Sequence, residues 1–120
     1  FLPEAEMEAI IASGLKPLTP RTIVDPTQLR KELEEVRTRG YAVSFGERIL
    51  GAVGVAAPVW GSGGRLIGAL DITIPDSRFY PGWDSVLGTM VCGHALKLSL
   101  KLGHIPNSGQ FDGDKSCAEG

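Results

Sequence analysis

The stretch YAVSFGERILGAVGVAAPVWGSGGRLIGALDITIP, residues 41–75, decides the fold of this chain. Large residues alternate with small or polar ones in three runs, at about 41–46, 53–60 and 66–74, and glycine-containing segments separate the runs. Because side chains along a strand point alternately to opposite faces of a sheet, this pattern predicts three β-strands with one bulky face. The opposite face should leave room for a helix, a partner chain or a small ligand. This small and polar face would consist of Ala42, Ser44, Gly46, Gly54, Ala56, Pro58, Trp60, Ile67, Ala69, Asp71 and Thr73.

The segments between these strands are predicted to be turns. Residues 46–51 begin and end with glycine, and Gly-Ser-Gly-Gly at 61–64 is the strongest hairpin signal in the chain. The second segment has the glycine content of a phosphate-binding loop, but it lacks the lysine and Ser/Thr of a P-loop, and a strand follows it. Pro58 removes one hydrogen-bond donor from the second strand, which predicts an edge or a bulge at that point.

Two helices are predicted before the strands. The first covers residues 3–13, where Pro3 suits the first helical position and Gly14 suits the end. The second covers residues 26–39, with Asp25 as its N-cap and Gly40 as its end. Oppositely charged residues four apart predict ion pairs along a solvated face of the second helix. These pairs are Arg30 with Glu34, Lys31 with Glu35, and Glu35 with Arg39.

A third helix is predicted at residues 83–102, and it is more apolar than one packed face requires. The additional apolar side chains would pack in a dimer contact, against a missing part of a longer chain, or in a deep groove. His94 shares the apolar face and is expected to pack there as a hydrogen-bonded histidine. Residues 104–120 are polar, glycine-rich and aperiodic, which predicts a disordered tail. The expected buried face of the helix consists of Trp83, Leu87, Met90, Val91, Leu98 and Leu102.

Composition and charge exclude several classes of function. The net charge of the chain is −2 and its basic residues do not cluster, so these residues lack the electrostatic footprint of nucleic-acid binding. No apolar run approaches the roughly 18 residues of a membrane span, and the first residues are not predicted to be a signal peptide. Cys92 and Cys117 suggest neither a disulfide framework nor a zinc site, which favours a cytoplasmic location. The first residue is not methionine, which indicates a piece of a longer protein.

Catalytic motifs are weak in this sequence. Ser44, Asp71 and His94 are the residue types of a nucleophile, an acid and a base, but no nucleophile elbow surrounds the serine. Glu47, Asp71 and a histidine lack the spacing of metal ligands. The sequence therefore predicts a protein that is not an enzyme and that uses no cofactor and no metal, with a small hydrolase as the alternative.

A series of short motifs runs in one register from residue 2 to residue 103. They are Leu2-Pro3-Glu4, Leu18-Thr19-Pro20, Thr22-Ile23, Leu29 to Leu33, Val36-Arg37, Arg39-Gly40-Tyr41-Ala42, Gly46-Glu47, Gly51, Val55-Ala56-Ala57-Pro58-Val59, Gly64, Ala69-Leu70, Pro75, Arg78-Phe79, Leu98-Ser99 and Leu102-Gly103. By these motifs the chain resembles the effector-binding domain of the IclR (isocitrate lyase regulator) family of bacterial transcription factors. The resemblance implies an α+β fold, with a GAF-like antiparallel sheet flanked by helices, over residues 1–103.

The resemblance also implies a function. The chain would be part of a metabolite-sensing domain, and it would act on DNA only through an N-terminal winged helix-turn-helix that these residues do not include. The start of the effector domain would be missing as well. A homodimer or homotetramer is expected. The alternative is a stand-alone GAF-like sensor or interaction module without DNA binding.

The expected effector site follows from the same resemblance. Family members that bind small carboxylates resemble one another in a polar cup, whose positions fall on Ser44, Gly54, Asp71 and Thr73; Ala56 lies on the same face. At all four positions this chain has a different residue from the family members that bind small carboxylates. Gly54 enlarges the cup, and an ionised Asp71 would repel a carboxylate, because an unpaired buried charge is costly. We therefore expect an effector that is larger than glyoxylate or pyruvate and supplies hydrogen-bond donors, such as hydroxyls or an amine. The alternative is that Asp71 bonds backbone groups at a strand end.

Overall fold

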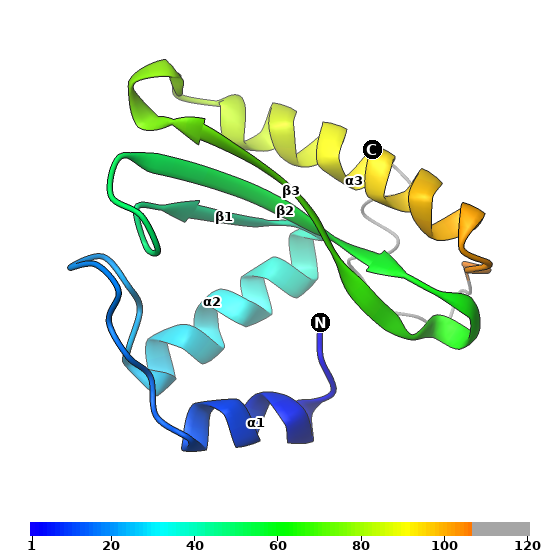
Figure 1. Cartoon of the computed structure of the whole chain (residues 1–120), viewed down its shortest axis with the longest axis horizontal. Helices are drawn as coiled ribbons and strands as arrows, with labels where there is room; N and C mark the ends of the chain where they lie inside the picture. Colours follow the sequence, from blue (N-terminus) through cyan, green and yellow to red (C-terminus); the bar gives the residue numbers. More distant parts are fainter. Residues whose placement is uncertain (107–120) are drawn as a thin grey trace.

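The computed structural model of this chain describes residues 1–106, which form one α+β unit. Its three strands make an antiparallel sheet in the order β1-β2-β3. Figure 1 shows α3 along one face of the sheet, with α1 and α2 on the other side. The predicted helices, strands, turns and fold class are confirmed. In chain order the elements are α1 (Glu4–Ala12), α2 (Pro26–Arg39), β1 (Ala42–Phe45), β2 (Ala52–Trp60), β3 (Leu66–Pro75) and α3 (Trp83–Lys101), with short 3₁₀ turns at Ser62–Gly64 and Asp76–Arg78.

Strand β2 is central and longer than β1, which determines where the sheet has an edge. Strand β1 pairs with residues 53–56 of β2, whereas β3 pairs with β2 along its whole length. Pro58 therefore lies beyond the last residue paired with β1, where its missing N–H costs no ladder bond on that side. The register also shifts between Val59 and Trp60. Both features confirm the irregularity predicted at Pro58.

The hydrophobic core lies between β2 and α3. Alternate residues of β2 point toward the helix and are 1% to 5% exposed, as expected for the bulky face of the strand. Burying one valine side chain contributes about 1.5 kcal/mol or more, so this row is a major source of stability. The buried cluster consists of Val43, Val53, Val55, Ala57, Val59, Val91, Cys92 and Ala95.

Helix α3 packs on the sheet through a different face from the one predicted. Its buried residues are small for the most part: Gly88, Val91, Cys92, Ala95 and Ser99. The valines of β2 already fill the interface, so the helix approaches through its small side chains. Of the predicted face, Val91 is buried and Leu87 packs partly against the core, whereas Trp83, Met90, Leu98 and Leu102 are exposed. His94 is also exposed, so its predicted packing role was wrong.

A buried hydrogen bond joins the end of β2 to α3. The backbone N–H of Trp60 donates to Ser99 Oγ at 2.9 Å, and the same hydroxyl donates to the carbonyl of Ala95 at 2.7 Å. His104, which is 3% exposed, stacks on the Trp60 ring with a centroid distance of 6.3 Å. The described residues therefore include His104, one residue past the predicted boundary at residue 103. The rest of the predicted tail, residues 107–120, lies outside the described residues.

We expect Ser99→Ala to lower the free energy of unfolding by about 1–3 kcal/mol, because it removes a buried acceptor while creating only a small cavity. Urea unfolding followed by tryptophan fluorescence measures this directly. Ser99→Cys keeps a weak acceptor of similar size and should lose less. A stability of Ser99→Ala equal to that of the wild type would show that this hydrogen bond contributes nothing.

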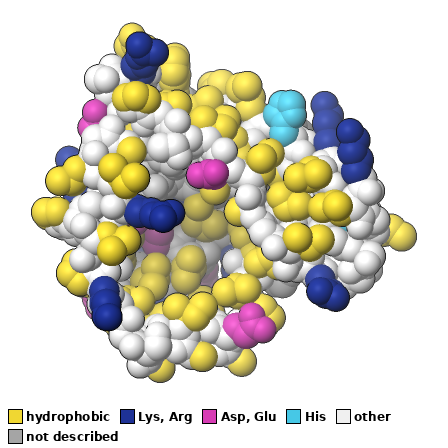
Figure 2. Space-filling model, in the orientation of Figure 1, with side chains coloured by type: hydrophobic (Ala, Val, Ile, Leu, Met, Phe, Trp, Pro, Cys, Tyr) yellow, Lys and Arg dark blue, Asp and Glu magenta, His cyan; other side chains and the backbone are white. Residues whose placement is uncertain are grey.

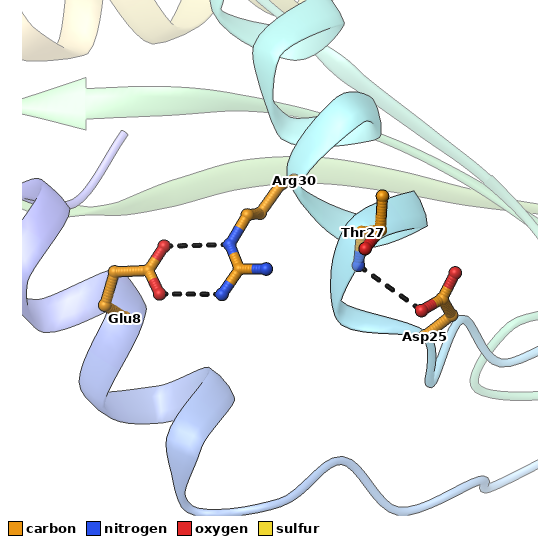
Figure 3. Close-up of polar contacts among 4 residues, drawn as sticks. All are labelled: Glu8, Asp25, Thr27 and Arg30. Carbon is orange, nitrogen blue, oxygen red and sulfur yellow. Dashed lines mark hydrogen bonds and ion pairs between the residues drawn. The ribbon is translucent and has the colours of Figure 1, made fainter.

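An ion pair joins helices α1 and α2, because Arg30 pairs with Glu8 of α1 and not with its predicted partner within α2. The Arg30 guanidinium donates from Nε and Nη2 to the two carboxylate oxygens of Glu8, at 2.9 and 2.8 Å (Figure 3). Within residues 1–106 this pair between helices forms in place of the predicted pairs four residues apart. Arg39 donates to the carbonyl of Tyr41 instead. The predicted N-cap is confirmed, because Asp25 Oδ1 accepts from the N–H of Thr27.

Candidate functional site

The small and polar residues of the sheet lie together on the face opposite α3. The register places Ser44 beside Gly54 and Gly54 beside Thr73. One step along, Ala56 pairs with Asp71 on β3. The alternation in the sequence predicted this common face, and the pairing of the three strands brings its members side by side.

An open cavity of about 160 Å³ lies on this face. Four of the five predicted site residues line it, and Ala56 does not. The remaining lining residues come from the turn between β1 and β2 and from the start of β2. The complete lining is Ser44, Glu47, Arg48, Ile49, Ala52, Gly54, Asp71 and Thr73.

Gly54 keeps the floor of the cavity open. A Cβ at this position would lie 3.1 Å from Ser44 Oγ, which is closer than ordinary contact. Asp71 also lines the cavity, and its Oδ2 accepts a hydrogen bond from Thr73 Oγ1 at 3.4 Å. In the described part of the chain the carboxylate of Asp71 thus bonds a side chain of the same cup. The alternative in which it bonds backbone groups at a strand end is not what the structure contains.

The turn between β1 and β2 forms one wall of the cavity, and hydrogen bonds from the linker between α1 and α2 hold it in place. Gly46 and Gly51 have φ of 69° and 80°, a left-handed conformation that favours glycine. Thr19 Oγ1 donates to the carbonyl of Gly46 at 2.5 Å, and Thr22 Oγ1 donates to the carbonyl of Glu47. The linker between α1 and α2 therefore fixes the turn beside the cup.

Sequence reasoning found only part of this wall. It placed Glu47 in a turn beside the pocket and favoured a structural role for it, and it assigned no chemistry to Thr19 or Thr22. One signal was available: a short turn that directly follows Ser44 and precedes Gly54 must lie at the same end of the sheet as those residues. The contribution of the linker had no such signal, because it depends on contacts 25 and 27 residues apart.

Glu47 has an unfavourable environment for a charged carboxylate. Burial raises the pKa of Glu47 above its ordinary value; a hydrogen bond from the backbone N–H of Phe45 opposes this rise, and the negative charge of Glu32 on α2 adds to it. Since folding raises this pKa, the ionised form of Glu47 destabilises the folded protein once the pH exceeds the unfolded pKa. The penalty disappears as the pH falls below both values.

We therefore expect Glu47→Gln to raise the melting temperature at neutral pH by up to a few degrees, because glutamine carries no charge to desolvate. At a pH below the ordinary range of a carboxyl group, the variant and the wild type should melt together. Differential scanning calorimetry at the two pH values gives the comparison. A gain that persists unchanged in acid would mean that packing, and not charge, is responsible.

The other combinations considered for catalysis do not assemble. His94 is exposed on α3, which covers the face of the sheet opposite Ser44 and Asp71, so these three residues form no catalytic set. Among residues 1–106, no group of three or more His, Cys, Asp or Glu side chains is arranged to hold a metal ion. None of the helices in this described range is both long enough and apolar enough to cross a membrane.

Two further cavities lie away from the polar face. One, of about 210 Å³, is almost entirely apolar and lies between α1 and α2, where Figure 2 shows a hollow with hydrophobic side chains on its floor. Its only charged lining residue is Arg37, which donates a hydrogen bond to the carbonyl of Leu2. The other, of about 360 Å³, lies between the first residues of the chain and the end of the β2–β3 hairpin.

Comparisons with known proteins identify the family. Residues 1–100 match the sequence profile described as bacterial transcriptional regulator IclR C-terminal. The HTH-type transcriptional repressor AllR of Klebsiella pneumoniae is 33% identical over 108 residues, which are 89% of this chain and 40% of the repressor. The Thermotoga maritima IclR structure is similar with a TM-score of 0.82 and 32% identity, covering 87% of this chain and 42% of that chain.

A third similar protein was solved with a ligand. It is the inducer-binding domain of a double mutant of the PobR transcription factor from Acinetobacter, in complex with 3-hydroxybenzoic acid. The TM-score is 0.70 at 34% identity, with 82% of this chain and 57% of that chain covered. The chain therefore belongs to the IclR C-terminal family of bacterial transcriptional regulators. It spans 37% to 40% of the length of the AllR repressors of Escherichia coli and Klebsiella pneumoniae.

Proposed function

We propose that this chain is the effector-sensing part of a bacterial transcriptional regulator, and that its effector binds in the cavity on the polar face of the sheet. The observation that carries the proposal is the convergence of Ser44, Gly54, Asp71 and Thr73 on one open cavity. Membership of a regulator family adds support, as does the inducer complex of the similar PobR domain. Ala56 completes the predicted set as a neighbour of Asp71 in the sheet.

The regulator would act as a switch and not as a catalyst. A ligand shifts an equilibrium between two conformations only by the difference in its affinity for them, and about 1.4 kcal/mol of difference changes DNA affinity tenfold. The turn at 46–51 is suited to transmit this difference. It borders the cavity on one side, and on the other it is bonded by Thr19 and Thr22 to the linker that leads from α1 to α2. Closure of the turn over a ligand would therefore displace the N-terminal helices.

The parent protein would work in the cytoplasm as a homodimer or homotetramer, and it would bind DNA through a winged helix-turn-helix outside these residues. The exposed apolar side chains of α3 are compatible with assembly into oligomers. Enzymatic activity is not part of the proposal, because the family and the similar proteins are described as transcriptional regulators.

The test is a DNA-binding assay with the native protein and the DNA upstream of its own gene. We expect binding that a metabolite extract of the source bacterium changes, and we expect Thr73→Val to lose that response while keeping its DNA affinity. Thr73→Val removes the hydroxyl but little volume. A response that Thr73→Val and Ser44→Ala both leave intact would count against this cavity. Failure of the native protein to bind any DNA would favour the stand-alone sensor module.

A further inference from the structure

The charged groups around the cavity do not balance. Two carboxylates, those of Glu47 and Asp71, line it together with one guanidinium, that of Arg48. The hydroxyls of Ser44 and Thr73 can each donate one hydrogen bond, but they also accept, and Thr73 already donates to Asp71. The lining is therefore richer in acceptors and negative charge than in donors and positive charge. A carboxylate ligand would meet net repulsion here, whereas a cation would meet net attraction.

The acidic side of the cavity extends onto α2. The charge of Glu32 acts unfavourably on Glu47, and burial acts in the same direction. Arg48 is exposed at the tip of the turn, and Arg21 of the linker approaches the turn at Gly46. A cation beside Glu47 would offset the repulsion between Glu47 and Glu32.

The size and the apolar part of the lining restrict the ligand further. A cavity of about 160 Å³ is comparable to an engineered cavity of roughly 150 Å³ that holds benzene. Ile49 and Ala52 supply apolar surface at the same end as Glu47. A single ammonium ion or a metal ion would leave most of this space unfilled. The lining suits a compact molecule with a hydrocarbon body and a positively charged donor group.

We propose that the effector is a small organic amine of about the size of a benzene ring with one substituent, and that Glu47 and Asp71 together select its ammonium group over a carboxylate. This inference rests on the proposed function, because it names the ligand class of the same cavity. It adds Glu47, a residue of the turn, as a determinant of specificity. Ser44 and Thr73 would accept or donate the remaining hydrogen bonds.

Three probes that share one ring separate the effect of charge from that of shape: benzylamine, benzyl alcohol and benzoate. We would titrate each into the native protein at neutral pH and follow backbone amide resonances by NMR. Benzylamine should shift the amides of Ser44, Gly54 and Thr73, and it should bind at least about tenfold more tightly than benzoate, since the two differ in the sign of their charge. Benzyl alcohol should fall between them.

Variants show which carboxylates make the selection. Asp71→Asn and Glu47→Gln should each reduce the preference for benzylamine over benzoate several-fold, while Asp84→Asn on α3, across the sheet, should leave it unchanged. Asp71 is exposed and Glu47 is penalised when charged, so neither neutral variant should unfold. The affinity for benzylamine should also decline as the pH falls and Glu47 takes up a proton.

The outcomes distinguish this inference from the proposed function. Benzoate that binds as tightly as benzylamine, or more tightly, with shifts at the same amides would overturn the amine inference and leave the sensing site in place. A preference for benzylamine that survives in both neutral variants would overturn the role of Glu47 and Asp71. If none of the three probes shifts an amide of the cavity, the site and the ligand class are both wrong.

Discussion

Gly88→Ala should lower the free energy of unfolding by about 2–3 kcal/mol, which is at the upper end of the usual cost of overpacking. The position is the point of closest approach between α3 and the aromatic ring of Tyr41. A Cβ on Gly88 would lie 2.5 to 2.6 Å from three carbons of that ring. The ring also makes a cation–π contact with the Arg39 guanidinium, 5.2 Å from its centroid, which a displacement of the ring would disturb. In an ordinary helix the same change would stabilise by up to about 1 kcal/mol.

Gly93→Ala is the matched control for this prediction. It lies in the same helix, and an added Cβ there meets nothing within 4 Å. We expect it to stabilise the protein by about 0.5–1 kcal/mol through helix propensity alone. Chemical unfolding of both variants measures the two effects. In a Tyr41→Ala background the cost of Gly88→Ala should vanish; a cost that stays the same there would show that the ring is not its cause.

Gly54→Val should weaken binding of a ligand in the cavity while leaving the fold intact. The side chain would start 3.1 Å from Ser44 Oγ and extend into the space between Ser44 and Thr73. Valine is well suited to a strand, and the β propensity scale spans about 1 kcal/mol, so stability should not decrease. Binding of whichever benzyl probe the wild type prefers should weaken at least about tenfold, equivalent to 1.4 kcal/mol. Isothermal titration calorimetry measures the loss.

Gly68→Val on β3 is the control for a valine placed elsewhere in the sheet. Its Cβ would have open space around it, and the residue does not line the cavity. The control should therefore bind the probe as the wild type does. Equal affinity in all three proteins would mean that the ligand lies somewhere other than over Gly54.

Local sequence patterns were sufficient to predict the sheet and much of the site. The alternation in 41–46 and 66–74 placed Ser44, Asp71 and Thr73 on one face, because strand geometry depends on nothing beyond neighbouring residues. Glycines at 40 and 103 follow the ends of helices, where a positive φ is needed. The two hairpins then leave one simple pairing order, so the common face of the polar residues followed without any long-range information.

The contacts between distant segments could not be predicted in the same way. The hydrophobic pattern of α3 is nearly uniform around the helix, so the sequence does not reveal that Gly88, Ala95 and Ser99 face the sheet. The face of α3 that packs on the sheet is determined by the valines of β2, which leave room only for small side chains. Arg30 has a possible partner four residues away and another on α1, and the fold brings Glu8 into bidentate reach. Surface pairs contribute only about 0–1 kcal/mol, so local charge patterns predict them poorly.

The most direct test of the central claim is a crystal structure of the native protein with the metabolite that most increases its melting temperature in a thermal-shift screen. We expect electron density for that metabolite over Gly54, between Ser44 and Thr73 and beside the turn that carries Glu47. Density in the apolar cavity between α1 and α2, with the polar face of the sheet empty, would contradict the account.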